Sequence, residues 1–331
     1  VSLEDVERQG LYALTGRRDG YAVPLLFSCA ATVALPLRVC STMTVPFETL
    51  AAVDLGSNSF RLQIVRVTEG GLFPIDSLKD TVRLGAGLLP NGNLDDAVAA
   101  RALACLARFG ERLRGFKPDR VRVVGTNTLR VANHAEAFIA QAEALLGFPI
   151  EIIAGREEAR LIYLGAAHSL PLSPEKRLVV DIGGGSTEFI IGQGMQALRT
   201  ESLTMGCVSY SLRFFPDGRM TRSRFRDAEL AARDQVQRIA RDFSPEHWQC
   251  AIGTSGTARS LRDILEQSDF SEEGITLDGM ERLRHELIKI GQMQDVTLKG
   301  LREDRAPVLP GGLAIMLAVF EELQVQGMGL T

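Results

Sequence analysis

A glycine-rich stretch in the middle of the chain, set between two apolar runs, most constrains how this sequence can fold. It reads Leu-Val-Val-Asp-Ile-Gly-Gly-Gly-Ser-Thr-Glu-Phe-Ile-Ile-Gly over residues 178–192. Aliphatic, β-branched and aromatic runs separated by a short glycine cluster are typical of a β-hairpin. Three glycines also let the backbone approach a ligand with its N–H groups turned inward, which is the geometry of an anion-binding nest. A turn between two core strands explains this stretch equally well when it is taken alone.

Two acidic residues flank the predicted turn. Asp181 ends the first strand and Glu188 begins the second, so both carboxylates should face the same mouth of the hairpin. A phosphate held by backbone amides beside carboxylates usually needs a divalent cation between them. The hairpin therefore predicts a phosphate and metal site, and its candidate phosphate-binding residues are Gly183, Gly184, Gly185, Ser186 and Thr187.

A second copy of this pattern occurs near the start of the chain. Val53-Asp-Leu-Gly-Ser-Asn-Ser-Phe60 again gives a strand, a terminal aspartate and a glycine turn with hydroxyl groups. Aligning Asp54 with Asp181 places Gly56 on Gly183, and the separation between the copies is the size of a domain. The duplication predicts two similar lobes that face each other across a cleft, unless the two turns resemble each other by chance. The phosphate-binding candidates of this copy are Gly56, Ser57, Asn58 and Ser59.

Composition narrows the class of protein. The 331 residues suffice for two domains with cores of their own. A net charge of −4 argues against nonspecific nucleic-acid binding, so an anionic substrate must be met by local basic groups and backbone amides. The five cysteines and four histidines show neither disulfide nor zinc spacing. We therefore expect a reduced, cytoplasmic location and, if a metal is used, a hard ion with oxygen ligands.

The first 46 residues differ from the rest of the chain. An apolar run over residues 21–39 loosely resembles a secretion signal or a membrane anchor. Two prolines interrupt the run, and it contains no stretch of 18 strongly apolar residues. We expect a loosely ordered extension or a misassigned start, with no stable membrane insertion.

The chain after the first hairpin shows ordinary packing elements. Residues 72–84 are predicted to form a strand with Lys79 and Arg83 on one face. Apolar residues at helical spacing predict helices from Val98 to Leu113 and over residues 222–243. Lys79 and Arg83 are candidates for the path of a long polyanion, although exposed basic side chains more often only face solvent.

Three further segments are candidates for chemistry. Gly-Thr-Asn-Thr-Leu-Arg over residues 125–130 follows a predicted strand, and ligands gather at such strand ends, so Arg130 is a candidate phosphate ligand or a solvated helix residue. Glu157 and Glu158 open a helix, where acidic residues suit the helix dipole. Either glutamate could take a proton from an attacking water, and the residues alone do not choose between them. A third loop opens a helix with Gly253, Ser255, Gly256 and Thr257, which are further phosphate-binding candidates.

Together these motifs resemble the exopolyphosphatase/guanosine pentaphosphate phosphohydrolase family, within the superfamily of actin, sugar kinases and heat-shock ATPases. The resemblance runs from about Ala51 to the C-terminus and rests on residues 54–59, 125–130, 155–160, 181–188, 205–207 and 253–256. It implies an α/β fold with two ribonuclease-H-like lobes around a central cleft, the first over residues 47–165 and the second over 166–331.

The resemblance also implies an activity and roles for single residues. The family hydrolyses terminal phosphate from inorganic polyphosphate or from guanosine pentaphosphate (pppGpp) with Mg²⁺. Glu158 matches the family's general base, Arg130 matches an arginine that contacts substrate phosphate, and Asp54, Asp181 and Glu188 match positions around the metal. Exopolyphosphatase is our leading interpretation, ahead of a pppGpp 5′-phosphohydrolase, a kinase and a non-catalytic sensor of guanosine pentaphosphate or tetraphosphate.

This chain departs from the family at both ends. Longer members carry further domains that supply dimer contacts and part of the polyphosphate channel, and no such region follows Thr331. We therefore expect a C-terminal truncation and keep a homodimer as a candidate assembly. The first 46 residues have no counterpart in the family.

Overall fold

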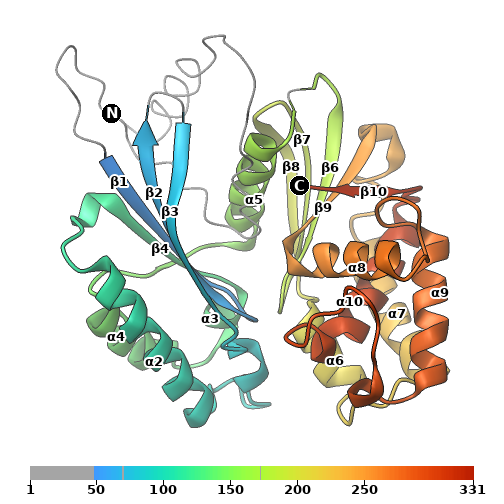
Figure 1. Cartoon of the computed structure of the whole chain (residues 1–331), viewed down its shortest axis with the longest axis horizontal. Coiled ribbons are helices and arrows are strands. Elements are labelled where there is room, and N and C mark those ends of the chain that lie inside the picture. The colour runs from blue at the N-terminus through green and yellow to red at the C-terminus, as the bar shows by residue number, and fades with distance from the viewer. Residues whose placement is uncertain (1–47, 69–70, 172) are drawn as a thin grey trace.

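The computed structural model describes residues 48–68, 71–171 and 173–331, so the predicted extension over residues 1–46 lies outside the described residues. Two lobes stand side by side, each built on a five-stranded sheet (Figure 1). The strand orders are β3-β2-β1-β4-β5 and β10-β9-β6-β7-β8. Read as β8-β7-β6-β9-β10, the second order repeats the first, so the duplication predicted from two turns extends to both whole sheets.

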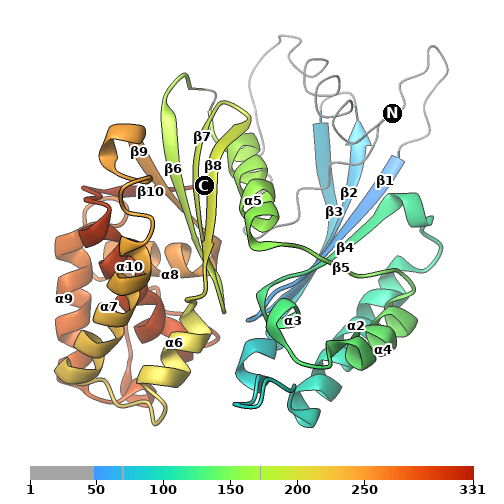
Figure 2. The same cartoon turned by 180° about the vertical axis from the view of Figure 1, so that it is seen from behind.

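The first lobe is an α/β layer structure. Its core lies between the first sheet and helices that cover one face of it (Figure 2). Its elements are β1 (Glu48–Leu55), β2 (Phe60–Thr68), β3 (Gly71–Asp80), η2 (Leu84–Gly87), α2 (Asp96–Leu113), η3 (Pro118–Arg120), β4 (Val121–Gly125), α3 (Asn127–Val131), α4 (Ala135–Leu146) and β5 (Glu151–Ile152).

The second lobe is larger and has helices on both faces of its sheet (Figure 1). Its elements are α5 (Gly155–Ser169), β6 (Lys176–Ile182), β7 (Thr187–Gln193), β8 (Gln196–Leu203), α6 (Cys207–Phe214), α7 (Arg222–Gln237), η4 (Pro245–His247), β9 (Cys250–Thr254), α8 (Ser255–Gln267), α9 (Leu277–Ile290), η5 (Met293–Asp295), η6 (Ala306–Val308), α10 (Leu309–Glu322) and β10 (Met328–Leu330).

Both predicted hairpins are confirmed, and their register places the acidic residues. β1 pairs antiparallel with β2 so that Asp54 lies opposite Arg61, and β6 pairs antiparallel with β7 so that Asp181 lies opposite Glu188. β4 runs parallel to β1, and β9 runs parallel to β6. The carboxyl ends of these parallel strands therefore meet the glycine turns at one edge of each sheet, where ligands collect in α/β folds.

Alternation along β6 explains why the second sheet is covered on both sides. Leu178, Val180 and Ile182 pack into the large helical core, while Val179 faces the other way and packs against α5. The far side of α5 also reaches the first lobe, where its Leu161 clusters with residues of β4 and of the segment after β5. Thus α5, which the sequence analysis placed at the end of the first lobe, packs mainly on the second sheet and lies between the two.

The predicted strand over residues 72–84 is shorter in the structure. β3 ends at Asp80, and the N–H of Val82 donates to the carbonyl of Asp80 at 3.1 Å, which turns the chain at Thr81. Lys79 is therefore in the strand, whereas Arg83 lies beyond it in a left-handed conformation with φ 54°. The prediction that both residues share one strand is wrong because this turn follows Asp80 directly.

The long predicted helices are largely confirmed. The side chain of Asp95 caps α2 by accepting a hydrogen bond from the N–H of Val98, and the apolar face of α2 is buried. The helix predicted over residues 222–243 ends at Gln237, since turns replace it from there on. Ile239 and Phe243 are nevertheless buried, so the apolar pattern identified core positions beyond the end of the helix.

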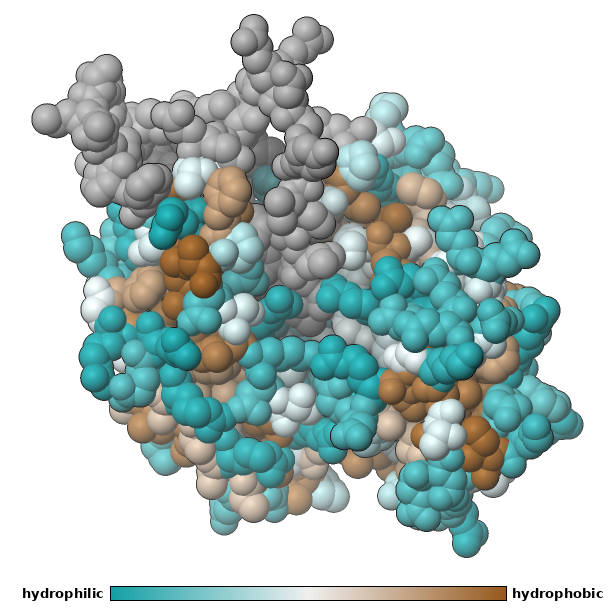
Figure 3. Space-filling view, viewed as in Figure 1, coloured by the Kyte–Doolittle hydropathy of each residue, from teal (hydrophilic) through white to brown (hydrophobic). Residues whose placement is uncertain are grey.

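Among the residues that the structure describes, no helix is long and apolar enough to cross a bilayer. Figure 3 shows that polar side chains cover most of the face seen in Figure 1, with apolar patches that are separate from one another.

Candidate active site

The two glycine turns obey the same backbone constraint. A Cβ atom on Gly183 would lie 3.1 Å from the carbonyl oxygen of Ser186, and one on Gly56 would lie 3.0 Å from that of Ser59. Contacts this short require the loop to shift, so glycine is favoured at both aligned positions. Ser57, Asn58 and Ser186 are buried, whereas Ser59 is half-buried.

The two turns meet where the lobes touch. A Cβ atom on Gly184 would lie 2.9 Å from the backbone nitrogen of Asn58, and one on Gly185 would overlap Oδ1 of Asn127. Neither position leaves room for a side chain, so these glycines permit the lobes to approach this closely. Two predicted phosphate loops from distant parts of the sequence are thereby brought into direct contact.

Four acidic side chains are buried around this contact. Asp54 and Asp181 end β1 and β6, Glu188 lies in β7, and Glu158 lies in the first turn of α5. Their exposed fractions are 4% for Asp54, 1% for Asp181, 1% for Glu188 and 7% for Glu158. Buried carboxyl groups are rare without partners, so each needs a hydrogen bond, a proton or a cation.

Asp54 is the least compensated of the four. Its Oδ1 is buried without a hydrogen-bond partner. Burial, followed by the negative charges of Glu158 and Asp181, raises the pKa of Asp54 to about 8, while Arg61 opposes the shift. A carboxyl group with such a pKa is short of positive charge, a condition typical of catalytic and cation-binding sites.

The carboxyl groups of the second hairpin are better hydrogen-bonded. The hydroxyl of Thr254 donates to Asp181 at 2.5 Å, and that of Ser202 donates to Glu188 at 2.9 Å. Burial still raises the pKa of Asp181 to about 6. Burial, with the charges of Glu158 and Asp181, raises the pKa of Glu188 well above its ordinary value. The hydrogen bonds therefore orient these carboxyl groups without removing the shortage of positive charge.

The cluster fits a hard cation that is shared with a substrate. Its donors are carboxylate oxygens, and one of them, Oδ1 of Asp54, has no partner. In the described ranges, no three Asp, Glu, His or Cys side chains form a group able to hold a metal ion by themselves. Mg²⁺ commonly binds one or two carboxylates and completes its shell with water and substrate phosphates. The predicted ligands Asp54, Asp181 and Glu188 suit that arrangement better than a closed cage.

The structure separates the two glutamates that the residue pattern left equivalent. Glu157 pairs with Arg160 at 2.9 Å in the same helix and is partly exposed. Glu158 is buried and accepts a hydrogen bond at 3.2 Å from Arg130, which also donates to the carbonyl of Ile153 at 2.7 Å. Burial raises the pKa of Glu158 to about 7, and Arg130 opposes that shift. Glu158 therefore has the setting of a general base, whereas Glu157 has that of a surface ion pair.

Several predicted phosphate-binding hydroxyl groups already donate to the backbone. Thr187 donates to the carbonyl of Met205 at 2.7 Å. Ser255 and Thr257 both donate to the carbonyl of Ile182, at 3.1 and 2.8 Å. These bonds fix the end of β6 beside the glycine turn, so the three hydroxyl groups support the loop in this structure.

The two glycines of the third loop have different neighbours. A Cβ atom on Gly253 would lie 2.7 Å from Cβ of Ala258 and 2.9 Å from Sδ of Met328, so this glycine serves core packing. A Cβ atom on Gly256 would overlap the guanidinium group of Arg305. Only Gly256 therefore faces a charged group that could meet an anion.

Sequence reasoning missed three residues that lie at this junction. Thr128 donates to the hydroxyl of Ser57 at 2.7 Å, and Asn127 contacts Gly185 of the other lobe. Arg305 is close enough to lower the pKa of Asp181. Thr128 and Asn127 were within a motif already singled out, but Arg305 comes before the last helix and no local pattern marks it.

Comparison of the chain with models of protein families identifies its family. A model of the Ppx/GppA phosphatase family matches residues 63–331, most of the chain. The chain belongs to this phosphatase family. The matched residues include the second glycine turn, Arg130 and Glu158, while the first turn lies just before them.

Solved Ppx/GppA structures show the same fold. An exopolyphosphatase from Cytophaga hutchinsonii is 23% identical with a TM-score of 0.76, covering 86% of this chain and 94% of that one. The Aquifex aeolicus PPX-GPPA enzyme is 24% identical with a TM-score of 0.69, covering 86% and 96%. An exopolyphosphatase-like protein is 24% identical with a TM-score of 0.75, covering 86% and 93%. The predicted α/β fold of two lobes is thus confirmed.

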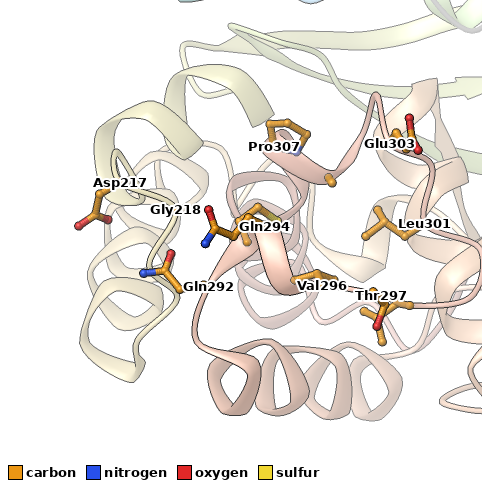
Figure 4. Close-up of a pocket in the computed structure, with 12 residues that line it drawn as sticks. Asp217, Gly218, Gln292, Gln294, Val296, Thr297, Leu301, Glu303 and Pro307 are labelled. Carbon is orange, nitrogen blue, oxygen red and sulfur yellow. The ribbon is translucent and has the colours of Figure 1, made fainter.

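One cavity of this Ppx/GppA protein lies away from the glycine turns. It has a volume of about 510 Å³ and lies in the second lobe between the turn after α6 and the segment from α9 to α10 (Figure 4). It contains none of the predicted site residues; its lining includes Asp217, Gln292, Val296, Leu301, Glu303 and Pro307. The predicted site residues therefore lie outside this cavity.

Proposed function

We propose that this protein is a phosphoanhydride hydrolase, and specifically an exopolyphosphatase that removes terminal phosphate from inorganic polyphosphate with Mg²⁺. The observation that carries the proposal is the contact of two glycine turns beside the buried pair of Glu158 and Arg130, 3.2 Å apart. Family membership supplies the general phosphatase chemistry. A cytoplasmic location and a homodimer remain predictions.

In the proposed mechanism, backbone amides hold the terminal phosphoryl group. The turns over residues 56–59 and 183–187 offer N–H groups from both lobes, and Arg130 offers a guanidinium group that can turn toward the phosphate oxygens. Mg²⁺, when bound, would take one or two carboxylates from among Asp54, Asp181 and Glu188, with substrate phosphate and water as its other ligands, and would neutralise charge on the transferred group. Catalysis is then mainly positioning and electrostatic stabilisation, as is usual for phosphoryl transfer.

Glu158 takes the proton of the attacking water. The water oxygen bonds to the terminal phosphorus as the bridging oxygen leaves with the shortened chain, and one water proton passes to the carboxylate of Glu158. A pKa of about 7 leaves a useful fraction of this group ionised at neutral pH while keeping it basic enough to accept the proton. Release of orthophosphate and loss of that proton to solvent return the site to its starting state.

The test compares two neighbouring glutamates. Mg²⁺-dependent phosphate release is measured from long-chain polyphosphate and from pppGpp with the wild type, Glu158→Gln and Glu157→Gln. Loss of a general base should lower turnover by about 10²- to 10⁴-fold in Glu158→Gln. Glu157→Gln, which removes only a surface ion pair, should keep near-normal turnover. Near-normal turnover of Glu158→Gln would refute the assignment of the base.

Comparing the two substrates distinguishes the exopolyphosphatase from the other candidate functions. Release from polyphosphate that Glu158→Gln abolishes supports the exopolyphosphatase. Release from pppGpp alone would assign the 5′-phosphohydrolase instead. Tight nucleotide binding without release would indicate a sensor, and ADP formation that depends on an added sugar would indicate a kinase.

A further inference from the structure

Arg83 has two features that the fold and the proposed catalysis leave unexplained. Its backbone adopts φ 54° and ψ 47°, a left-handed conformation that residues other than glycine, asparagine and aspartate rarely adopt. Its Nε–H group is buried without a hydrogen-bond partner. A strained backbone and an unsatisfied buried donor on one residue are both unfavourable, and both occur preferentially at ligand sites.

The surroundings of Arg83 impose this conformation. Its N–H donates to the carbonyl of Asn58 at 2.8 Å, and the N–H of Gly85 donates to the carbonyl of Ser57 at 2.8 Å. Its neighbours Val82 and Leu84 are both fully buried in the core of the first lobe. Arg83 is therefore fixed against the first glycine turn, where backbone strain persists only if the neighbouring contacts hold it.

A cavity between the lobes is lined by residues that closely precede Arg83 in the sequence. It has a volume of about 660 Å³ and is lined by Lys79 and Thr81 of the first lobe and by residues 301–304 of the second. Arg83 follows Thr81 by two residues, past the turn that ends β3. On the opposite wall Arg305 follows Asp304, and its guanidinium group lies against Gly256 of the third loop. On each side of the cavity, the lining residues are therefore followed in the sequence by an arginine that lies beside a predicted phosphate loop.

The lining of this cavity carries both signs of charge. Lys79 and Arg302 are its basic groups, Glu303 and Asp304 are its acidic groups, and Nε of Arg302 donates to Asp304 at 3.0 Å. None of the described lining residues is aromatic, so the cavity offers no platform on which a nucleobase could stack. The neighbouring cavity of Figure 4 shares Leu301 and Glu303, but its described lining contains no basic residue. An anion is therefore better placed beside Lys79.

We propose that Arg83, together with Lys79, binds phosphate groups of the substrate beyond the one that is cleaved. In this arrangement the terminal phosphate lies at the two glycine turns, and the chain continues past Arg83 into the cavity between the lobes. The buried Nε–H of Arg83 then gains an anionic acceptor, which satisfies the donor that the protein itself leaves unpaired. The inference rests on the proposed function only for the identity of the substrate.

The experiment measures binding of tripolyphosphate and pyrophosphate, in the presence of Mg²⁺, by titration calorimetry. Arg83→Asn removes the guanidinium group with a residue that tolerates left-handed backbone, and Arg83→Lys keeps the charge. Arg114→Asn, at a side chain that is 74% exposed at the end of α2, controls for the loss of one positive charge. Loss of a charge-assisted hydrogen bond should weaken tripolyphosphate binding about ten- to a hundredfold in Arg83→Asn. Pyrophosphate binding should change by less than about threefold, and Arg83→Lys should recover part of the tripolyphosphate affinity.

Steady-state kinetics of the same variants provide a second test of the inference. For an active enzyme, Arg83→Asn should raise KM for tripolyphosphate while leaving kcat within about threefold, since the contact is remote from the cleaved bond. Unchanged tripolyphosphate affinity in Arg83→Asn overturns the inference, as does an equal loss for both ligands. If Arg83→Asn does not fold, Lys79→Gln provides the same comparison of the two ligands. A protein that hydrolyses nothing but still loses tripolyphosphate affinity in these variants would refute the proposed function and retain the subsite.

Discussion

Replacing Arg130 by glutamine should shift the pH dependence of hydrolysis to higher pH. Arg130 is the positive group nearest to Glu158, with 3.2 Å between Nη1 and Oε2, and its side chain is only 24% exposed. Two opposite charges about 4 Å apart attract by roughly 4 kcal/mol at an effective dielectric constant near 20. Solvent at the partly exposed guanidinium group screens much of this, so we expect a change of about 1–2 pKa units in Glu158.

The sign follows from the role of Glu158. Arg130 lowers the pKa of Glu158, which is about 7, so its removal raises that pKa. The base must be ionised, hence a rise of about 1–2 units leaves only about a tenth to a hundredth of it active at pH 7. Turnover should therefore fall by about five- to fiftyfold at pH 7 through this effect alone, and it should recover as the pH is raised.

The assay is initial phosphate release at saturating polyphosphate across pH 6–10, taken as the ratio of Arg130→Gln to wild type. The ratio cancels ionisation of the substrate and of the other carboxyl groups as far as these are common to both proteins. Arg130→Lys, which keeps a positive charge, should retain more of the wild-type profile. A ratio that stays low and constant with pH would refute the reasoning, because Arg130 would then act only on the substrate phosphate.

Two further substitutions test the buried charges and the contact between lobes. Without divalent cations, Asp54→Asn should raise the melting temperature: the pKa of Asp54 is raised to about 8, so its contribution to stability is present at low pH and is lost as the pH rises from about 4 through 8. The new side-chain amide of Asp54→Asn leaves a donor unpaired, which offsets part of this effect. The free energy of unfolding near pH 8 should therefore rise by about 1–3 kcal/mol. Mg²⁺ should stabilise the wild type more than Asp54→Asn in the same melts; equal stabilisation of both would argue against a cation at Asp54. Gly185→Ala should lower kcat by more than about tenfold with near-native circular dichroism, since the new methyl group meets Asn127 across the junction. Unchanged kcat would mean that closure at Gly185 is not needed for turnover.

Local pattern was enough to predict the hairpins and their acidic ends. Two apolar runs around three glycines predicted the strands, the turn and two carboxylates at one mouth, and the pairing of Asp181 with Glu188 agrees with this. The repeat of this strand, aspartate and glycine-turn pattern likewise predicted two similar lobes. Longer-range geometry was not accessible in this way. Nothing local shows that α5 packs on the second sheet, or that Gly185 meets Asn127 of the other lobe.

Hydroxyl groups were predicted less well than glycines and carboxyl groups. Thr187 and Thr257 are hydrogen-bonded to backbone carbonyls, because a hydroxyl group donates equally well to a main-chain oxygen or a phosphate. Arg83 was a candidate for the polyanion path, but its placement in a strand was wrong. A single turn after Asp80 changes both its backbone conformation and its neighbours, and strand periodicity carries no information about such a turn.

The choice between Glu157 and Glu158 shows what the structure adds to the sequence. Both are in the first turn of α5, and the helix dipole favours them equally. Successive helical residues point about 100° apart, so one can face Arg160 on the surface while the next faces Arg130 across the junction. Burial raises the pKa of Glu158 to about 7. The same burial that makes Glu158 a suitable base places it among Asp54, Asp181 and Glu188. We propose that a cation, bound together with the anionic substrate, supplies the positive charge that this cluster lacks.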